Sequence, residues 1–264
     1  MYTIDLTGKT GLVMGVANHR SIAWAIAQPL AEAGAQLAYS YQGDRLKPAL
    51  ESLTEGQDAL LVPCDVTKDE DLDALFAAVE ERFGRLDYLV HALAFAPQAT
   101  FDRPFVEITR EDWRIAMDVS AYSLVATARR AAPLMAEGGS ILTLSYLAAE
   151  RVVPHYNMMG VAKAALEASV RYLAYDLGAQ GIRVNALSAG PVRTIAGRSI
   201  RGFGDMYGEA GRQSMLRRNI ETDEVGGFGF ALLAAPLGGG VTGETVYVDA
   251  GFHAIGMFLP ERAS

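Results

Sequence analysis

Short apolar runs alternate with helical patterns along almost the whole chain, and this alternation restricts the possible fold more than any other feature. Continuous apolar runs are typical of strands that are buried on both faces of a parallel sheet. We identify seven such runs, at residues 11–15, 35–41, 59–65, 86–94, 140–146, 182–190 and 244–251. Helices are expected between them, at residues 21–33, 44–54, 69–83, 111–136, 157–178 and 223–235. Strands that alternate with helices predict right-handed crossovers, and therefore an α/β fold with a doubly wound, parallel, seven-stranded sheet and helices on both faces.

No stretch of linker composition interrupts this alternation, so we expect a single domain over residues 1–264. One segment, at about 191–219, is rich in glycine and arginine and shows no clean periodicity. An irregular insertion of this length is usually a functional lid or a disordered loop. Because it follows the carboxyl end of a strand, where α/β sheets bind ligands, we interpret it as a substrate-binding lid.

Composition excludes several classes of function. The formal net charge of −8 argues against general nucleic-acid binding. The single cysteine, Cys64, excludes an internal disulfide and fits a reducing compartment, so we expect a cytoplasmic location. No apolar run approaches the ~18 residues needed to span a bilayer, and the first residues lack a signal-peptide layout, so no membrane insertion is expected. No metal site is expected either, because ligand spacing is missing among the four histidines: His19, His91, His155 and His253.

The first predicted strand is followed by a turn and a helix, the place where a dinucleotide pyrophosphate commonly binds. The turn reads GVANHRSIAWAIA and lacks the G-x-G-x-x-G pattern, because only Gly15 is present. Ser21 is a natural N-cap, and its hydroxyl and the amide of Ile22 can face an anion at the positive end of the helix. An ordinary capped helix start explains this fragment equally well.

Tyr156 and Lys163 are seven residues apart at the start of a predicted helix. Seven residues of α-helix turn through about 700°, nearly two full turns, so both side chains can share one face. The usual Y-x-x-x-K pattern of short-chain dehydrogenases would need tyrosine at position 159, where Met159 stands, and its serine position holds Tyr146. Without further context, a half-buried helix face with aromatic packing would account for these residues.

This double departure resembles the NADH-dependent enoyl-(acyl carrier protein) reductases of bacterial fatty-acid synthesis, a divergent branch of the short-chain dehydrogenases. The resemblance covers nearly the whole chain and includes GVANHRSIAWAIA, HALAFAP, LTLSYLAAERVVPHYNMMGVAKAALEASVRYLA and GIRVNALSAGPVRT. It implies a Rossmann-type version of the predicted sheet. It also explains the first turn, which is two residues longer than usual and so gives the backbone room without a glycine at every tight position. One departure is Ala94, where this family often has glycine.

The resemblance implies conjugate reduction of a trans-2-enoyl thioester, the last step of the fatty-acid elongation cycle. It assigns the Tyr156 hydroxyl as the donor to the thioester oxygen and Lys163 as the ligand of the nicotinamide ribose. Tyr146 either lines the pocket or helps to relay a proton, and Ala96, Tyr146 and Tyr156 contact substrate. Cofactor contacts are implied for Gly15, Ser21, Ile22, Gln42, Asp65, Val66, Leu93, Ala94, Lys163, Val192, Arg193, Thr194, Ile195 and Ala196. For Asp65, capping of the helix near Asp69 is the alternative.

NADH is the cofactor that the resemblance implies. Many NAD-binding proteins place an acid on the adenosine ribose after the second strand. Here Gln42 holds that position and does not repel a 2′-phosphate, while the nearby Arg45 can attract one, so NADPH stays open as an alternative.

The implied partners are an acyl carrier protein that carries the enoyl thioester and, as in much of the family, three further copies of the chain in a homotetramer. Arginines are concentrated in the predicted lid, at Arg193, Arg198, Arg201, Arg212, Arg217 and Arg218, against only Asp205 and Glu209. Such a concentration of positive charge can steer an acidic carrier protein. A solvated loop fits nearly as well.

Two other functions are consistent with parts of the sequence. A 3-ketoacyl or alcohol dehydrogenase of the wider superfamily is disfavoured by Tyr146, by Met159 and by Ser120, where that group tends to have asparagine. A catalytically silent NAD-binding regulator would need neither Tyr156 nor Lys163, so their joint presence argues against it.

Overall fold

The computed structural model describes residues 4–198, 200–235 and 237–257. Within these residues, seven strands form one parallel sheet in the order β3-β2-β1-β4-β5-β6-β7. The strands are β1 (Thr10–Met14), β2 (Gln36–Tyr41), β3 (Leu60–Pro63), β4 (Tyr88–His91), β5 (Gly139–Ser145), β6 (Ile182–Ala189) and β7 (Thr245–Val248). The predicted doubly wound, parallel, seven-stranded sheet is therefore confirmed.

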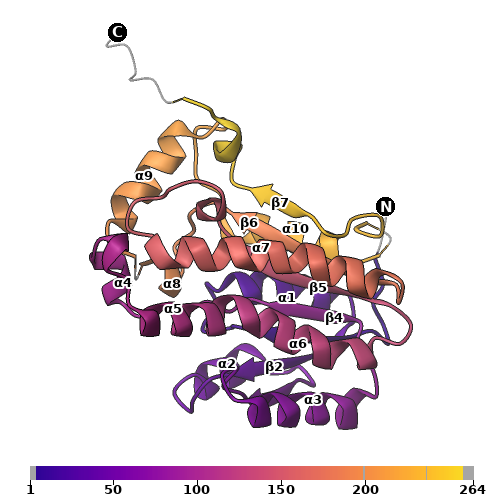
Figure 1. Ribbon diagram of the computed structural model, residues 1–264. Coiled ribbons are helices and arrows are strands. Elements are labelled where there is room, and N and C mark those ends of the chain that lie inside the picture. Colours follow the sequence, from indigo (N-terminus) through magenta and orange to yellow (C-terminus); the bar gives the residue numbers. More distant parts are fainter. Residues whose placement is uncertain (1–3, 199, 236, 258–264) are drawn as a thin grey trace.

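Helices cover both faces of the sheet, with α6 and α7 in front of it and α1 and α10 behind it in the view of Figure 1. One layer contains α1 (Ile22–Glu32), α2 (Lys47–Leu53) and α10 (Thr222–Leu233), and the other contains α3 (Asp69–Phe83), α6 (Ser123–Ala131) and α7 (Asn157–Gly178). Strand β1 shows why both layers are needed. Leu12 and Met14 pack against the α3–α6–α7 layer, while Val13, between them, packs against the other.

The helix expected over residues 111–136 is interrupted, and this prediction is wrong. Helix α5 (Arg110–Met117) is followed by a π-helical turn, Asp118–Tyr122, before α6 begins. The hydroxyl of Ser123, the first residue of α6, donates to the carbonyl of Val119 in this turn. The Ser120 hydroxyl binds the backbone of Phe95 instead of the helix. The break thus accompanies a contact with a distant loop. Such π-helical turns are frequent at functional sites.

The segment at 191–219 contains two helices, α8 (Ile195–Arg198) and α9 (Phe203–Gln213), so its expected irregular structure is also wrong. Helix α9 begins after Gly202, whose φ of 71° favours glycine. It buries Ala210 and Gly211, and a Cβ on Gly211 would lie 2.5 Å from Asn219 Nδ2. Phe203, Met206 and Tyr207 repeat at i, i+3 and i+4 on the less exposed face of α9, so the sequence does carry an amphipathic helix signal among its many glycines.

Helices α1 and α10 approach each other closely behind the first strands. A Cβ on Gly226 would lie only 2.3 Å from the carbonyl oxygen of Ala25. The carbonyl of Ala25 accepts no helical hydrogen bond from Pro29, four residues later, because proline has no N–H group. Gly226 therefore lets α10 support α1, the helix that follows the first turn.

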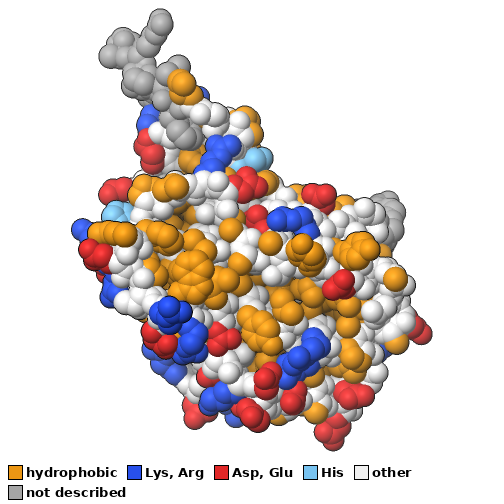
Figure 2. Space-filling model, viewed as in Figure 1, with side chains coloured by type: hydrophobic (Ala, Val, Ile, Leu, Met, Phe, Trp, Pro, Cys, Tyr) orange, Lys and Arg blue, Asp and Glu red, His pale blue; other side chains and the backbone are white. Residues whose placement is uncertain are grey.

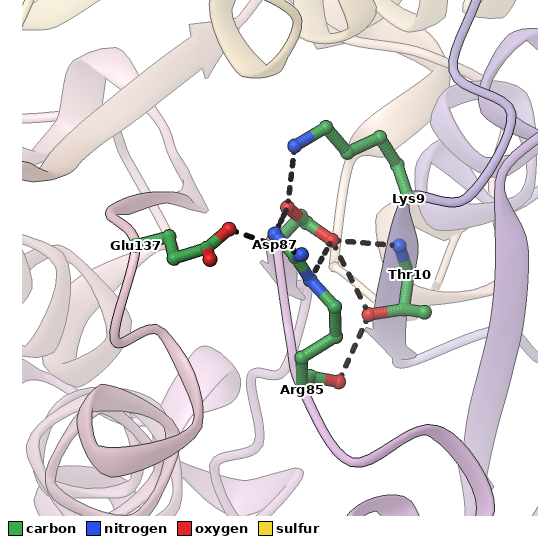
Figure 3. Close-up of polar contacts among 5 residues, drawn as sticks. All are labelled: Lys9, Thr10, Arg85, Asp87 and Glu137. Carbon is green, nitrogen blue, oxygen red and sulfur yellow. Dashed lines mark hydrogen bonds and ion pairs between the residues drawn. The ribbon is translucent and has the colours of Figure 1, made fainter.

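The edge of the sheet opposite the predicted site is closed by a polar cluster around Asp87 (Figure 3). The carboxylate accepts from Lys9 Nζ at 2.9 Å, from the Thr10 amide at 3.0 Å and from the Arg85 guanidinium at 2.7 Å, while Glu137 pairs with Arg85 from outside. Burial by itself raises the pKa of Asp87, but these hydrogen bonds outweigh burial and lower the pKa below its usual value. The charged carboxylate thus ties together the starts of β1 and β4.

We predict that Asp87→Asn destabilises the protein by about 2 kcal/mol at neutral pH, because charge-assisted hydrogen bonds are lost. A carboxyl whose pKa is lowered on folding stabilises above its unfolded pKa of about 4, and this contribution is lost as the pH falls through the folded value. The difference between variant and wild type should therefore shrink in acid. Urea unfolding at neutral pH and at about pH 3 measures the free energy of unfolding of both proteins. A difference that does not change with pH would contradict a charged Asp87 carboxylate in the folded protein.

The matched control is Asp58→Asn, which removes the ion pair with Arg82. Both side chains of that pair are largely exposed, so its loss should change stability by less than about 1 kcal/mol.

Candidate functional site

A cavity of about 430 Å³ lies at the carboxyl ends of β1, β2, β3 and β4. The crossovers leave β1 in opposite directions there, and α/β sheets bind ligands at such a switch point. Six predicted cofactor residues line this cavity: Gly15, Gln42, Asp65, Val66, Leu93 and Ala94. Sequence reasoning missed Val16, Ala17, Ser40, Tyr41, Leu46, Cys64, Thr67, Phe95, Ile115 and Val119.

Cys64 is the missed residue for which the sequence held a signal, because it stands between the end of a strand and the predicted Asp65. Cys64 is 6% exposed and packs as a small buried hydrophobe. Burial, followed by the nearby carboxylates, raises the pKa of its thiol to about 12. The thiol is thus neutral and forms part of the cavity wall.

Gly15 is the one position of the first turn where glycine is sterically required. Its φ is 99°, and a Cβ would lie 2.2 Å from the carbonyl oxygen of Ala92. Ser21 stands at the N-cap of α1, but its side chain makes no capping hydrogen bond to the helix, which corrects that prediction. Instead, its Oγ accepts from the amides of Ala17 at 3.0 Å and Asn18 at 3.2 Å. Ser21 therefore closes the long turn.

Asp65 and Gln42 form one wall of the cavity. Asp65 Oδ1 accepts from the amide of Thr67 at 3.1 Å and from its hydroxyl at 2.7 Å. Burial raises the pKa of Asp65, but hydrogen bonds from Thr67 and Gln42 outweigh burial and lower it. The N-cap position of α3 is occupied by Lys68, so the alternative in which Asp65 caps that helix is wrong.

Tyr156, Tyr146 and Lys163 lie in one region between β5 and the start of α7. Tyr156 is the N-cap residue of α7 and is 9% exposed, and its ring centroid is 4.9 Å from that of Tyr146, which directly follows β5. Ala96 belongs to the same buried cluster as Tyr156. Lys163, two turns along α7, donates from Nζ to the carbonyl of Leu144 on β5 at 2.6 Å.

Burial sets the protonation states of these groups. It raises the pKa of Tyr146 to about 12, and it raises the pKa of Tyr156 further above the ordinary value. Both phenols are therefore protonated at neutral pH and can donate hydrogen bonds. Burial also lowers the pKa of Lys163 to about 8, against the opposing effect of Glu167. At neutral pH the ammonium is still predominantly charged.

His91 lies completely buried at the end of β4, although sequence reasoning gave it no role. Its Nδ1 is 2.9 Å from the Thr143 hydroxyl, and its Nε2 is 2.8 Å from the Ser123 hydroxyl. Burial, assisted by the charge of Lys163, lowers the pKa of His91 to about 3. A neutral imidazole thus connects β4, β5 and the start of α6.

The predicted contacts at the start of 191–219 lie apart from the first cavity. Val192 and Arg193 line a second cavity of about 250 Å³, together with Arg20, Tyr207, Ile220, Glu221 and Thr222. The Arg193 guanidinium lies 4.5 Å from the Tyr207 ring centroid. Thr194 Oγ1 accepts from the amide of Gly197 at 3.0 Å and so caps α8, a role that was not predicted. The Ile195 side chain is exposed, and that of Ala196 lies outside the described residues.

The two cavities do not include every predicted cofactor residue. Neither cavity is lined by five of them: Ser21, Ile22, Lys163, Thr194 and Ile195.

In the described ranges, no helix is long and apolar enough to cross a membrane. Across the same ranges, no group of three or more histidine, cysteine, aspartate or glutamate side chains is arranged to hold a metal ion.

Known proteins share both the sequence and this arrangement. The profile of the enoyl-(acyl carrier protein) reductase family matches residues 15–253. An NADH enoyl-(acyl carrier protein) reductase of Rhizobium meliloti is 49% identical over 96% of this chain and 93% of its own length. One of Bacillus cereus is 48% identical over 95% of this chain and 99% of its own.

Solved structures agree with the sequence relatives. The Bacillus cereus enzyme with NADP+ and indole naphthyridinone superposes with a TM-score of 0.93, at 46% identity over 97% of this chain and 100% of that chain. The Anaplasma phagocytophilum enzyme in complex with NAD gives 0.92, at 47% identity over 97% of this chain and 98% of that chain. The chain therefore belongs to the enoyl-(acyl carrier protein) reductase family.

Proposed function

We propose that Tyr156, Tyr146 and Lys163 carry the family's reaction in this chain. The chain is an oxidoreductase that reduces the carbon–carbon double bond of trans-2-enoyl-(acyl carrier protein) thioesters with NADH, in the last step of the fatty-acid elongation cycle. The observation that supports the assignment is the buried phenol of Tyr156, packed on Tyr146 and on the same helix as the buried Lys163. Such donors act most strongly where water is excluded.

The first cavity fits the adenosine half of NADH. The missing Cβ of Gly15 lets the first turn pack against the backbone of Ala92, and the amides at the start of α1 that no side chain caps suit a pyrophosphate. We assign Gln42, Asp65 and Val66 to the adenosine, Gly15, Ser21 and Ile22 to the pyrophosphate, Leu93 and Ala94 to a ribose, and Lys163 with Val192, Arg193, Thr194, Ile195 and Ala196 to the nicotinamide half. Gln42 is neutral and Arg45 is exposed, so NADPH remains an alternative cofactor.

Bound NADH supplies the hydride that adds to the β-carbon of the enoyl thioester. As that bond forms, negative charge develops on the thioester oxygen, and the Tyr156 hydroxyl donates a hydrogen bond to it. The raised pKa keeps the proton on Tyr156 until this charge appears. A proton from solvent then adds to the α-carbon, which discharges the enolate and completes the saturated thioester. A preorganised donor of this kind lowers a barrier by roughly 2.7–4 kcal/mol.

Lys163 and Tyr146 support this donor in different ways. Lys163 Nζ uses one proton on the Leu144 carbonyl, which leaves two for the nicotinamide ribose hydroxyls. Its positive charge also favours the charge that develops nearby. Tyr146 covers one side of the Tyr156 ring, and its hydroxyl lies 3.4 Å from Met206 Sδ of α9. Tyr146 thus lines the substrate pocket where 191–219 covers it.

We propose that residues 1–264 act as one dinucleotide-binding and catalytic domain, with 191–219 as its substrate-binding lid. An acyl carrier protein is the proposed partner at the mouth of the lid. Several lid arginines are paired within the chain: Arg212 with Glu209, Arg218 with Glu224 and, at 3.9 Å, Arg201 with Asp102. The positive charge available to steer the carrier protein is therefore smaller than the sequence predicted.

We further propose a homotetramer in the cytoplasm. Figure 2 shows apolar side chains gathered over the face formed by α5, α6 and α7. Tyr172 and Tyr175 of α7 are 75% and 87% exposed, and Trp113 and Tyr122 extend the apolar surface toward α5. Contiguous exposed apolar surface of this kind commonly marks an interface between proteins. The cytoplasmic location rests on the unpaired Cys64.

We predict that Tyr156→Phe lowers kcat by about 10²- to 10³-fold, because the donor to the thioester oxygen is lost. NADH affinity should be unchanged, since the ring keeps its packing against Tyr146. The assay follows the loss of reduced-nicotinamide absorbance with a crotonyl thioester, and acetoacetyl thioester serves as the alternative substrate. Tyr172→Phe, on the exposed face of α7, is the matched control. Full activity of Tyr156→Phe would overturn the proposal. So would a wild-type protein that reduces only the acetoacetyl thioester and not the crotonyl thioester.

We predict that NADH affinity falls as the pH rises through about 8, the lowered pKa of Lys163, because lysine loses its positive charge above its pKa. The loss between neutral pH and one unit above this pKa should approach about tenfold if only the charged form binds. Lys163→Met should bind NADH weakly at every pH. Titration of nicotinamide fluorescence measures the NADH dissociation constant of wild type and variant at each pH. An equally steep pH dependence in Lys163→Met would exclude Lys163 as the source of the effect.

We predict that aspartate at both Tyr172 and Tyr175 splits the tetramer into smaller assemblies, because charges would be buried in the apolar interface. Phenylalanine at both positions keeps the surface apolar and should leave the tetramer intact. Light scattering gives the mass of each form. A monomeric mass for the wild-type protein would refute the tetramer.

A further inference from the structure

Two segments that are distant in the sequence meet beside the reaction site. One is the loop that follows β4, which lines the cofactor cavity with Leu93 and Ala94 and reaches the Tyr156 cluster with Ala96. The other is the start of α7, which carries Tyr156. The distance between a substrate held by the first segment and the phenol of the second depends on what fixes them together.

The loop is fixed at two points. Near its beginning, the buried Ser120 hydroxyl accepts from the amide of Phe95 and donates to its carbonyl, both at 2.9 Å. Near its end lies the short helix α4 (Ala99–Asp102). There, Asn157 Nδ2 donates to the carbonyls of Thr100 and Arg103, both at 2.9 Å. A side-chain amide carries two N–H groups, and both are used.

Asn157 has a second property that few residue types share. Its φ is 40°, and His155, on the other side of Tyr156, has a φ of 67°. Positive φ is disfavoured for most L-residues, and asparagine is among those that tolerate it. Glycine accepts this conformation but has no amide, and aspartate tolerates it but presents acceptors to the two carbonyls. Asparagine combines the required backbone with two donors.

We propose that Asn157 is a positioning residue for the reduction: its amide fixes the end of the substrate-side loop to the residue next to Tyr156. The inference rests on the proposed role of Tyr156 as the donor. The proposed role of Asn157 involves no contact with the reacting atoms or the cofactor. It sets the separation between the phenol and the loop that carries Ala96.

The proposal predicts which kinetic constants change. Loss of the amide frees the loop at Thr100 and Arg103, while Ser120 still holds the part that lines the cofactor cavity. NADH affinity should therefore stay within about twofold of wild type. A misplacement of about 1 Å between reacting groups can cost about 100-fold in rate, so kcat/KM for the enoyl thioester should fall at least tenfold.

Three variants separate the amide from the backbone. Asn157→Gly keeps the positive φ and removes both donors, and we expect at least a tenfold loss of kcat/KM. Asn157→Asp also keeps the backbone but places acceptors against two carbonyls, so its loss should be larger. His155→Gly adds the same flexibility on the other side of Tyr156, where the side chain is exposed, and should stay close to wild type.

The experiment measures kcat/KM with crotonyl thioester and the NADH dissociation constant for each variant, with Tyr156→Phe beside them. Retained NADH affinity shows that a variant is folded. Full activity of Asn157→Gly, or an equal loss in His155→Gly, would overturn the role of the amide. If Tyr156→Phe is fully active, the proposed function itself fails. A loss in Tyr156→Phe together with an active Asn157→Gly would refute only the positioning role.

Discussion

The parallel sheet is buried on both faces, and this constraint determines where polar chemistry can lie. Leu12, Val13 and Met14 face alternate helical layers, so no side chain in the middle of β1 is available for a ligand. Polar groups gather at the two edges instead. At one edge Asp87 closes the strand starts with charge-assisted hydrogen bonds, and at the other the strand ends open into the cavity of about 430 Å³. The two edges are thus specialised, one for stability and one for binding.

Burial also sets the protonation states of the proposed reacting groups, and it shifts their pKa values in opposite directions. It disfavours any charged form, so it keeps the phenols of Tyr146 and Tyr156 protonated while it brings the pKa of Lys163 down to about 8. Lys163 keeps its charge at neutral pH because the ordinary pKa of lysine lies far above 7. The same environment therefore yields neutral donors beside a cation, without a metal ion or a catalytic carboxylate among the groups assigned here.

Much of the fold follows from local patterns, whereas the break in the helix expected at 111–136 arises from a contact between distant residues. The helices expected at 69–83 and 157–178 have these bounds in the structure, and six of the predicted cofactor residues lie at strand ends around one cavity. The break at Asp118–Tyr122 was missed because Ser120 binds Phe95, 25 residues earlier. Helix α9 was missed for another reason, because its apolar repeat at Phe203, Met206 and Tyr207 stands among many glycines. No local period carries the signal for the break.

The first turn shows how a missing motif can be replaced. A phosphate-binding turn needs a close approach between its backbone and the neighbouring strand, and it needs free N–H groups at the start of the helix. Here the close approach is concentrated at Gly15, where a Cβ would collide with Ala92. The extra residues are held by Ser21, which accepts from the amides of Ala17 and Asn18 rather than from the helix. Because this serine is occupied with the turn, the amides of the first turn of α1 are left uncapped by it. A glycine-poor sequence thus meets the same physical requirement with one glycine and one hydroxyl.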